Sequence, residues 1–395
     1  MLLIAIATTP SKFQVKADSE LMKNQKQAVV MGPQQHFQVL QTSDGDAMFF
    51  SIGSEGVFYV THEKRTSDSG WERIDLSSSL IGTESSAEGK AKSFAVLQNP
   101  KTLDVDVVLV ISTVGNDALY ISAGNSCSSE AWTDGISWTD VPFDAADGQP
   151  PSPFVFSDMY MLAENTTKGP GGLTWFVDIV SSPDSSFRRL ERYFIELNSA
   201  PKWIRHTLPN DVEEGSIASC LSRRQSDLYA GVYSLRKIES SKSLEFTPTK
   251  NYWDKSPPTT ARLEYLSRTT AITSCPNRDG LTNLFVAAND GLYVFLPDRQ
   301  KDKDIGKLII PSSPVCNTNT FYRAKQLSSS SISSRTVVWG LNSMADLVYS
   351  SCPACSETDP ASWSPPMRIS SAVSQFAFYI NRQAPSNVLF ALIED

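Results

Sequence analysis

The sequence predicts an all-β fold of repeated four-stranded units, and two observations carry that prediction. Short apolar segments rich in β-forming residues begin near residues 37, 94, 160, 217, 272, 322 and 376, about 55 residues apart. Each is followed by a turn and a second apolar strand, and several by a third strand that contains a tyrosine. One such sheet cannot bury both of its faces alone, so units of this period stack around an axis as a β-propeller.

Residues 37–76 hold the clearest unit. They predict strands at 37–41, 47–52, 57–61 and 71–76. The intervening TSDGD, GSEG and SDSG segments supply the glycines and short polar side chains that tight turns require. The first strand, FQVLQ, returns almost unchanged as FAVLQ at 94–98. The later units follow the same order of strand, turn and strand.

The last unit has only two strands before the chain ends at Asp395. Apolar segments at 2–7, 13–15 and 28–31 precede the first unit, so we expect residues 1–36 to complete the last one. The prediction is a single domain over residues 1–395 with seven four-stranded blades, closed by pairing of the N- and C-terminal segments. Six blades are the alternative. The N-terminal apolar run lacks the basic residues of a signal peptide, which favours a strand there.

Composition limits the partners. The net charge is −8 and the pI is about 5.1. Lysines and arginines are scattered, which argues against nucleic acid as a partner. No apolar run approaches the length of a membrane span. An even number of cysteines and one glycosylation sequon at Asn165 favour a secreted, extracellular protein. The sequence does not determine how the cysteines pair: Cys127, Cys220, Cys275, Cys316, Cys352 and Cys355.

No metal or cofactor site is expected. The chain has three histidines, which are few candidates for the ligands of a zinc site or for the base of a Ser-His-Asp triad. Cys352 and Cys355 form a C-x-x-C segment without a second pair, so a local disulfide or two plain thiols are the readings left open.

Three links between third and fourth strands share a motif. They read SDSGW at 67–71, TDGISW at 133–138 and TDPASW at 358–363. These links resemble the Asp-box of sialidases and related propellers, although the first is two residues short and the third has Pro360. The resemblance implies that Asp68, Asp134 and Asp359 cap turns and that each tryptophan packs between blades.

Candidate ligand contacts lie on or just after the first strands, because these strands and their loops line the axial funnel of a propeller. The polar candidates are Gln38, Gln98, Glu164, Arg323 and Lys325. The aromatic candidates, Trp175 and Trp339, lie on second strands, where they serve either as core or as a stacking platform.

The leading functional hypothesis is a ligand-binding propeller with its site in the axial funnel and glycans as the candidate ligand class. Repeated tryptophans, short polar turns and an acidic, serine-rich composition resemble fungal lectin-type propellers. The alternative is an enzyme with one axial site. It would be either a glycosidase or lyase, or a secondary-metabolite cyclase resembling fungal propellers that catalyse hetero-Diels–Alder reactions. An interaction module of a larger protein is the third hypothesis.

Overall fold

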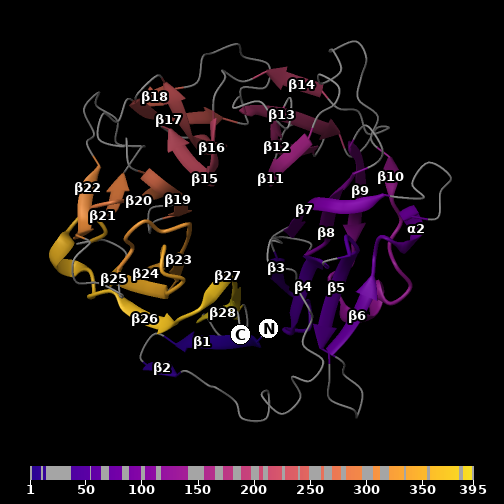
Figure 1. Cartoon of the computed structure of the whole chain (residues 1–395), viewed down its shortest axis with the longest axis horizontal. Coiled ribbons are helices and arrows are strands. Elements are labelled where there is room, and N and C mark those ends of the chain that lie inside the picture. The colour runs from indigo at the N-terminus through magenta and orange to yellow at the C-terminus, as the bar shows by residue number, and fades with distance from the viewer. Residues whose placement is uncertain are drawn as a thin grey trace. The chain divides into compact units, whose positions relative to one another are not determined.

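A computed structural model gives the fold (Figure 1). The residues that it describes are 2–9, 12–14, 37–53, 55–63, 71–81, 89–98, 103–112, 117–140, 155–164, 172–180, 188–196, 204–207, 212–224, 227–238, 241–248, 259–261, 269–276, 282–295, 306–311, 320–332, 335–353, 356–381 and 386–393. The chain divides into two compact units. Unit 1 comprises Met1–Thr8, Gln14–Asn210 and Ala377–Phe390, and unit 2 comprises Thr9–Phe13, Asp211–Phe376 and Ala391–Asp395.

Four-stranded sheets make up both units, and neighbouring strands within a sheet follow chain order. In unit 1 the sheets contain β3 (Phe37–Gln41), β4 (Ala47–Ile52), β5 (Phe58–Glu63) and β6 (Trp71–Asp75); β7 (Lys90–Gln98), β8 (Val105–Ser112), β9 (Asp117–Asn125) and β10 (Thr139–Asp140); and β11 (Val155–Glu164), β12 (Gly172–Val180), β13 (Arg188–Glu196) and β14 (Ile204–Thr207). All pairings in these three sheets are antiparallel.

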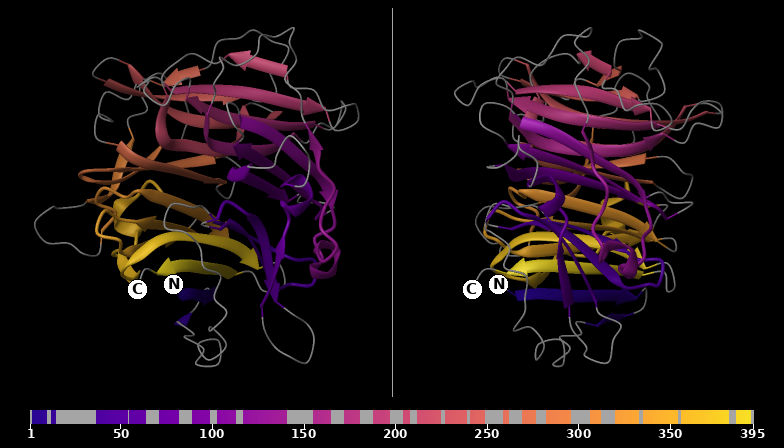
Figure 2. Two further views of the ribbon diagram at one scale, coloured as in Figure 1. Left: turned by 45° about the vertical axis from the view of Figure 1, so that its right-hand side comes forward. Right: turned by 90° about the vertical axis from the view of Figure 1, so that its right-hand side faces the viewer.

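Unit 2 repeats the arrangement. Its sheets contain β15 (Val212–Arg224), β16 (Asp227–Ile238), β17 (Ser241–Pro248) and β18 (Thr259–Ala261); β19 (Thr269–Pro276), β20 (Thr282–Ala288), β21 (Gly291–Phe295) and β22 (Lys307–Pro311); and β23 (Gln326–Ile332), β24 (Arg335–Leu341), β25 (Leu347–Pro353) and β26 (Met367–Ser370). Figure 2 shows the sheets from two further sides.

The ends of the chain share one more sheet. Its strands are β1 (Leu2–Thr9), β2 (Lys12–Gln14), β27 (Val373–Asn381) and β28 (Ser386–Ile393), in the order β2-β1-β28-β27. The N-terminal strand β1 therefore pairs with the C-terminal strand β28, as the apolar segments at both ends predict. With the six sheets above, the described residues form seven four-stranded sheets, and the all-β propeller class is confirmed.

Burial follows the position of a strand in its sheet. The second strands β4 and β8 are buried on both faces, whereas the fourth strands β6 and β26 are half-buried or exposed. A strand that is apolar throughout suits a sheet covered on both sides. First strands of consecutive sheets contact one another, β3 with β7 and β7 with β11 in unit 1, and β15 with β19 and β19 with β23 in unit 2. This order is what stacked blades require.

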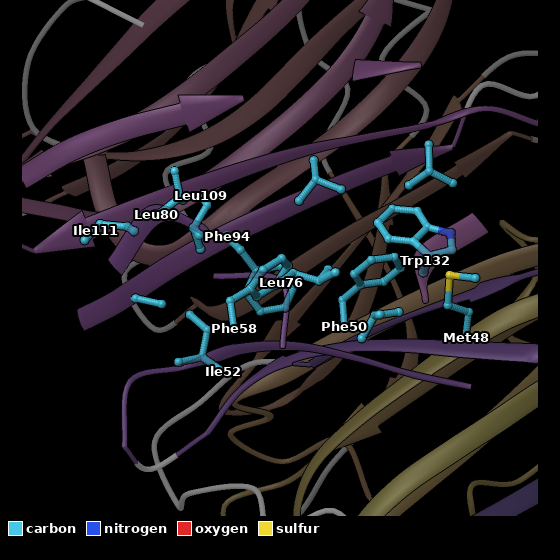
Figure 3. Packing of buried hydrophobic residues seen from close by; sticks show 14 of the residues in the cluster. Met48, Phe50, Ile52, Phe58, Leu76, Leu80, Phe94, Leu109, Ile111 and Trp132 are labelled. Atoms are coloured by element: carbon cyan, nitrogen blue, oxygen red, sulfur yellow. The ribbon is translucent and has the colours of Figure 1, made fainter. Parts of the chain in front are cut away.

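Alternate residues of facing second strands build the core. In unit 1, Met48, Phe50 and Ile52 of β4 share one buried cluster with Val107 and Leu109 of β8. In Figure 3 the rings of Phe58 and Phe94 lie side by side, with centroids 5.0 Å apart. A matching cluster in unit 2 joins Phe285 of β20 to Val338 of β24. The two-residue side-chain period of a strand brings these positions to one face.

Short helical turns connect some of the strands. The 3₁₀ turns η2 (Ser129–Trp132) and η7 (Pro360–Ser362) each lie between a third and a fourth strand. The helix α2 (Ser78–Ile81) has four residues. In the part of the chain that the structure describes, no helix is long and apolar enough to span a membrane.

Candidate functional site

The segment before β23 is a turn, whereas the sequence predicts a first strand that begins near residue 322. The backbone N–H of Ala324 donates to the carbonyl oxygen of Phe321 at 3.1 Å, which closes the turn. Arg323 has a φ of 46°, in the left-handed region. That conformation cannot continue a strand, so β23 begins only at Gln326. We call residues 321–325 the Arg323 turn.

Buried and exposed side chains alternate irregularly along this turn. Phe321 and Ala324 are fully buried and belong to the apolar cluster of unit 2. Arg323 and Lys325 are exposed, and Tyr322 is half-buried between the two types. The buried pair anchors the backbone, and the two cations extend into solvent from an anchored base.

Asn289 holds the arginine. The Arg323 Nε–H donates to Asn289 Oδ1 at 3.3 Å, and the guanidinium carbon lies 5.3 Å from the centroid of the Tyr322 ring. Asn289 and Asp290 form the two-residue loop between β20 and β21, where Ala288 pairs with Gly291. Two neighbouring sheets of unit 2 therefore meet at this guanidinium.

Asp290 carries a second polar pair next to Asn289. The Tyr293 hydroxyl donates to Asp290 Oδ2 at 2.6 Å. Burial, the hydrogen bond to Asp290 and the charge of Asp290 raise the pKa of Tyr293 to about 12. The hydroxyl is therefore protonated at neutral pH and keeps donating to the carboxylate. Asp290 itself is exposed and retains Oδ1 as an acceptor.

In the first sheet, the loop between β4 and β5 carries a similar acid–tyrosine pair, and an arginine of the same sheet binds the acid. Glu55 precedes β5, and Glu55 Oε1 accepts from the Tyr59 hydroxyl at 2.5 Å and from Arg73 Nη2 at 3.0 Å. The Arg73 guanidinium lies 3.3 Å from the Tyr59 ring centroid. The same acid–tyrosine pairing thus occurs in both units, but in the first sheet an arginine of that sheet covers it.

The predicted residues Gln38 and Gln98 connect neighbouring sheets of unit 1. The backbone N–H of Val96 on β7 donates to Gln38 Oε1 at 2.8 Å. The amide Nε2 of Gln98 donates to the Gln41 carbonyl at 3.1 Å and contacts Cys127 Sγ at 2.8 Å. Their near-identical strands, FQVLQ and FAVLQ, therefore place glutamines at the junction of two sheets, where the side chains bond to the backbone.

Unit 2 uses a glutamine in the same way. Gln326 Nε2 donates to the Phe376 carbonyl at 2.8 Å, and the Phe376 N–H donates to Gln326 Oε1 at 3.4 Å. Gln326 sits at the first residue of β23 and Phe376 in β27. Sequence reasoning missed this residue, although a glutamine on a first strand is the same signal that singled out Gln38.

Three of the predicted ligand contacts remain: Trp339, Glu164 and Trp175. Trp339, on β24, is fully buried, in agreement with the core reading of this residue. Glu164 is the last residue of β11, where it pairs with Gly172, and Trp175 of β12 pairs with Met161. The structure describes no more than the backbone of these two.

The third of the three predicted links contains the capped 3₁₀ turn η7. Asp359 caps η7, because its Oδ1 accepts from the Ala361 N–H at 3.1 Å and its Oδ2 from the Ser362 hydroxyl at 2.9 Å. These bonds, that from Ser362 first, lower the pKa of Asp359. Trp363 follows, buried, with its indole N–H donating to the Glu357 carbonyl at 2.9 Å.

The second link has a different register from the predicted one. The tryptophan equivalent to Trp363 is Trp132, whose indole N–H also donates to a carbonyl six residues earlier, that of Ser126, at 2.9 Å. Ser128 takes the capping position of Asp359 without a side-chain hydrogen bond. Trp138 is a further contact between sheets, since its N–H donates to the Leu76 carbonyl at 2.8 Å. Asp68 lies outside the described residues.

Among the described residues, the cysteines and the potential metal ligands support no further site. Cys127 and Cys352 are buried thiols outside any disulfide, so the C-x-x-C segment has at least one plain thiol. Within the described residues, no group of three or more His, Cys, Asp or Glu side chains is placed to hold a metal ion.

The likeness to known proteins is one of fold. No protein-family model matches the sequence, and no curated protein matches it. Among solved structures, the BP39L lectin from Burkholderia pseudomallei has a TM-score of 0.51 at 14% identity, covering 85% of this chain and 84% of that one. AofleA from Arthrobotrys oligospora has a TM-score of 0.45 at 9% identity, covering 87% and 88%. The Aleuria aurantia lectin, a six-bladed β-propeller, has a TM-score of 0.44 at 10% identity, covering 86% and 97%. The chain's own four-stranded sheets assign it to the all-β propeller class.

Proposed function

We propose that this chain is a glycan-binding β-propeller and that a sugar binds at the Arg323 turn. Arg323 and Lys325 are among the residues predicted for the axial funnel, and the proposal keeps the site at that end of the first strand. The observation that carries it is the exposed Arg323 guanidinium, held by Asn289 beside the Tyr322 ring.

The chemistry of the turn suits a sugar. A pyranose presents hydroxyl groups that donate and accept, and a face of C–H bonds. The guanidinium offers N–H donors in a planar fork. Asp290 offers a carboxylate acceptor, and a tyrosine ring offers an apolar face with a polar tip. These groups come from a two-residue loop and a turn anchored by buried residues, so little conformational freedom is lost on binding.

Divergence between the units favours one such site over several equal ones. At the first sheet Arg73 covers the acid–tyrosine pair. At the Arg323 turn no described residue forms an ion pair with Asp290 or with Arg323. We therefore expect these residues to be available to a ligand in unit 2 and occupied internally in the first sheet.

Binding to an immobilised glycan panel, followed by isothermal titration with the best ligand, tests the proposal. We expect Arg323→Ala to weaken binding by at least tenfold, the size of one charge-assisted hydrogen bond. Arg335→Ala is the matched control, since Arg335 is an exposed arginine at the far end of β24. Absence of binding to every glycan, or equal loss in both variants, would contradict the proposal.

An extracellular location forms part of the same proposal, because the glycans of other cells and matrices lie there. The sequon at Asn165 supports it. Expression in the native host, with the protein measured separately in medium and cells, tests the location.

A further inference from the structure

We infer that the ligand of the Arg323 turn carries a carboxylate, so that the site selects acidic sugars such as uronic or sialic acids over neutral ones. This inference rests on the proposed function and deepens it. Three properties of the turn carry it, and one neighbouring charge opposes it.

The first property is uncompensated positive charge. Arg323 and Lys325 are exposed, two residues apart, and neither forms an ion pair with a described residue. Arg73 and Arg368, by contrast, pair with Glu55 at 3.0 Å and with Asp346 at 3.6 Å. The whole chain has a net charge of −8, so acidic residues are plentiful. Two exposed cations that form no ion pair with a described residue leave a place for an external anion.

The second property is the orientation of the Arg323 guanidinium, which leaves its Nη groups as donors for a ligand. The Nε–H is used by Asn289, which fixes one edge of the group. Its Nη groups form no hydrogen bond with any described residue. A carboxylate accepts two parallel N–H bonds from such a fork, an arrangement that a single hydroxyl cannot match.

The third property is backbone strain beneath the arginine. Arg323 occupies the third position of a turn with φ of 46°, where glycine or asparagine is favoured. Among the described residues, the other non-glycine positions with positive φ are Leu103, Ala345 and Ala372, none of which is charged. A glycine would satisfy the turn better, so the arginine conflicts with local preference. Such conflicts concentrate at functional sites.

Asp290 is the opposing charge. It is exposed and follows Asn289 directly, and its Oδ2 accepts from Tyr293. It lies beyond ion-pair distance from Arg323 and Lys325, since neither residue has such a partner among the described residues. Among the described residues, Arg323, Lys325 and Asp290 together leave one positive charge in excess, which favours a monoanionic ligand group.

Titration with matched ligands tests the inference. A glycan that ends in a uronic or sialic acid is compared with the same glycan whose carboxyl is converted to an amide, which keeps the shape and removes the charge. We expect the amide to bind about 10- to 100-fold more weakly. We also expect affinity for the acidic glycan to fall as the NaCl concentration rises, because salt screens an exposed ion pair between Arg323 and the ligand carboxylate.

Three variants separate the contributions of the positive charge, the planar guanidinium group and the stability of the turn. Arg323→Gly relieves the strain, so we expect no fall in Tm but loss of binding. Arg323→Lys keeps the charge and loses the fork, so we expect intermediate affinity. Ala345→Gly, at φ of 61°, is the control for strain relief and should leave binding unchanged.

The possible outcomes distinguish this inference from the proposed function. Equal affinity for acid and amide, with Arg323 still required, would overturn the inference and leave glycan binding in place. Binding to neither would overturn both. Preference for the acid that survives Arg323→Gly would place the carboxylate elsewhere and overturn the inference.

Discussion

Trp363 meets Phe285 edge to face, with ring centroids 5.7 Å apart and ring planes at 78°. The tryptophan follows η7 in one sheet, and the phenylalanine belongs to the second strand of the preceding sheet. Trp132 and Phe50 repeat this arrangement in unit 1, at 5.3 Å and 76°. Each indole N–H donates to a carbonyl six residues earlier, so the ring is held by its own loop while its edge packs on the neighbouring sheet. The pair joins consecutive sheets.

Replacing Trp132 should strongly destabilise the fold. Trp132 is fully buried, so Trp132→Ala removes a large ring and leaves a cavity, at a cost of about 3–5 kcal/mol. The measurement is the free energy of unfolding in urea. Trp138→Ala is the comparison, since Trp138 is half-buried, and it should cost less. Equal losses would argue against the special position of Trp132.

Asp359→Ala should lower Tm at neutral pH because it removes the cap of η7. Hydrogen bonds from Ser362 and Ala361 lower the pKa of Asp359 below that of the unfolded chain. A lowered carboxyl pKa contributes stability above the unfolded value and loses it as pH falls through the folded value. The difference in Tm from the parent protein should therefore shrink in acid. Asp134→Ala, in the link without an equivalent cap, should change Tm little at either pH.

Asp106→Asn should stabilise the protein at neutral pH. Asp106 is buried on β8, and burial raises its pKa, against the hydrogen bond from the Gly124 N–H at 2.8 Å. A raised carboxyl pKa means that stability falls as pH rises from the unfolded value through the folded one. Asparagine keeps an acceptor for Gly124 and removes the charge. Thermal melts should show a higher Tm at pH 7 and a smaller difference at pH 3. Asp134→Asn, at an exposed position, is the control, and an equal gain there would contradict the explanation.

Gln38→Leu should expose the amide of Val96 to exchange. The Val96 N–H donates to Gln38 Oε1 at 2.8 Å, and leucine offers no acceptor. Hydrogen exchange at Val96 should accelerate, and stability should fall by about 1–2 kcal/mol because a partly buried donor loses its partner. Gln38→Glu retains an acceptor and should protect Val96. If Gln38→Leu leaves exchange unchanged, the glutamine does not connect the two sheets in solution.

Asp290→Asn should lower the pKa of Tyr293 from about 12 toward its ordinary value. Burial is the largest cause of that pKa and is unchanged by the substitution, so the pKa should remain above 10. Ultraviolet titration of tyrosinate, with Tyr293→Phe to assign the signal, measures it. Tyr59, which has its own acid in Glu55, should keep its pKa of about 12 in the Asp290 variant. A shift in Tyr59 instead would show that the signals were wrongly assigned.

Several strand positions could be predicted from the sequence because they depend on the local pattern of apolar and turn-forming residues. The predicted strands at 37–41 and 47–52 coincide with β3 and β4. Apolar runs bounded by turn residues specify such strands, and their recurrence every 55 residues or so specifies stacked sheets. Pairing of the chain ends followed from the same pattern, since an unfinished unit at one end and spare strands at the other complete a sheet.

The roles of individual side chains were decided by tertiary structure. Gln38 and Arg323 both carry polar groups beside a first strand, yet Gln38 bonds to the backbone of the neighbouring sheet and Arg323 extends into solvent. The tryptophan register in the second link depends on which ring reaches Phe50, and no local pattern separates Trp132 from Trp138. These outcomes depend on which groups from distant parts of the chain become neighbours. The sequence by itself determined the repeat, the class of fold and strands such as β3 and β4, because each follows from local periodicity. Only the packing of one sheet on the next decided which polar residues hold the scaffold and which extend into solvent.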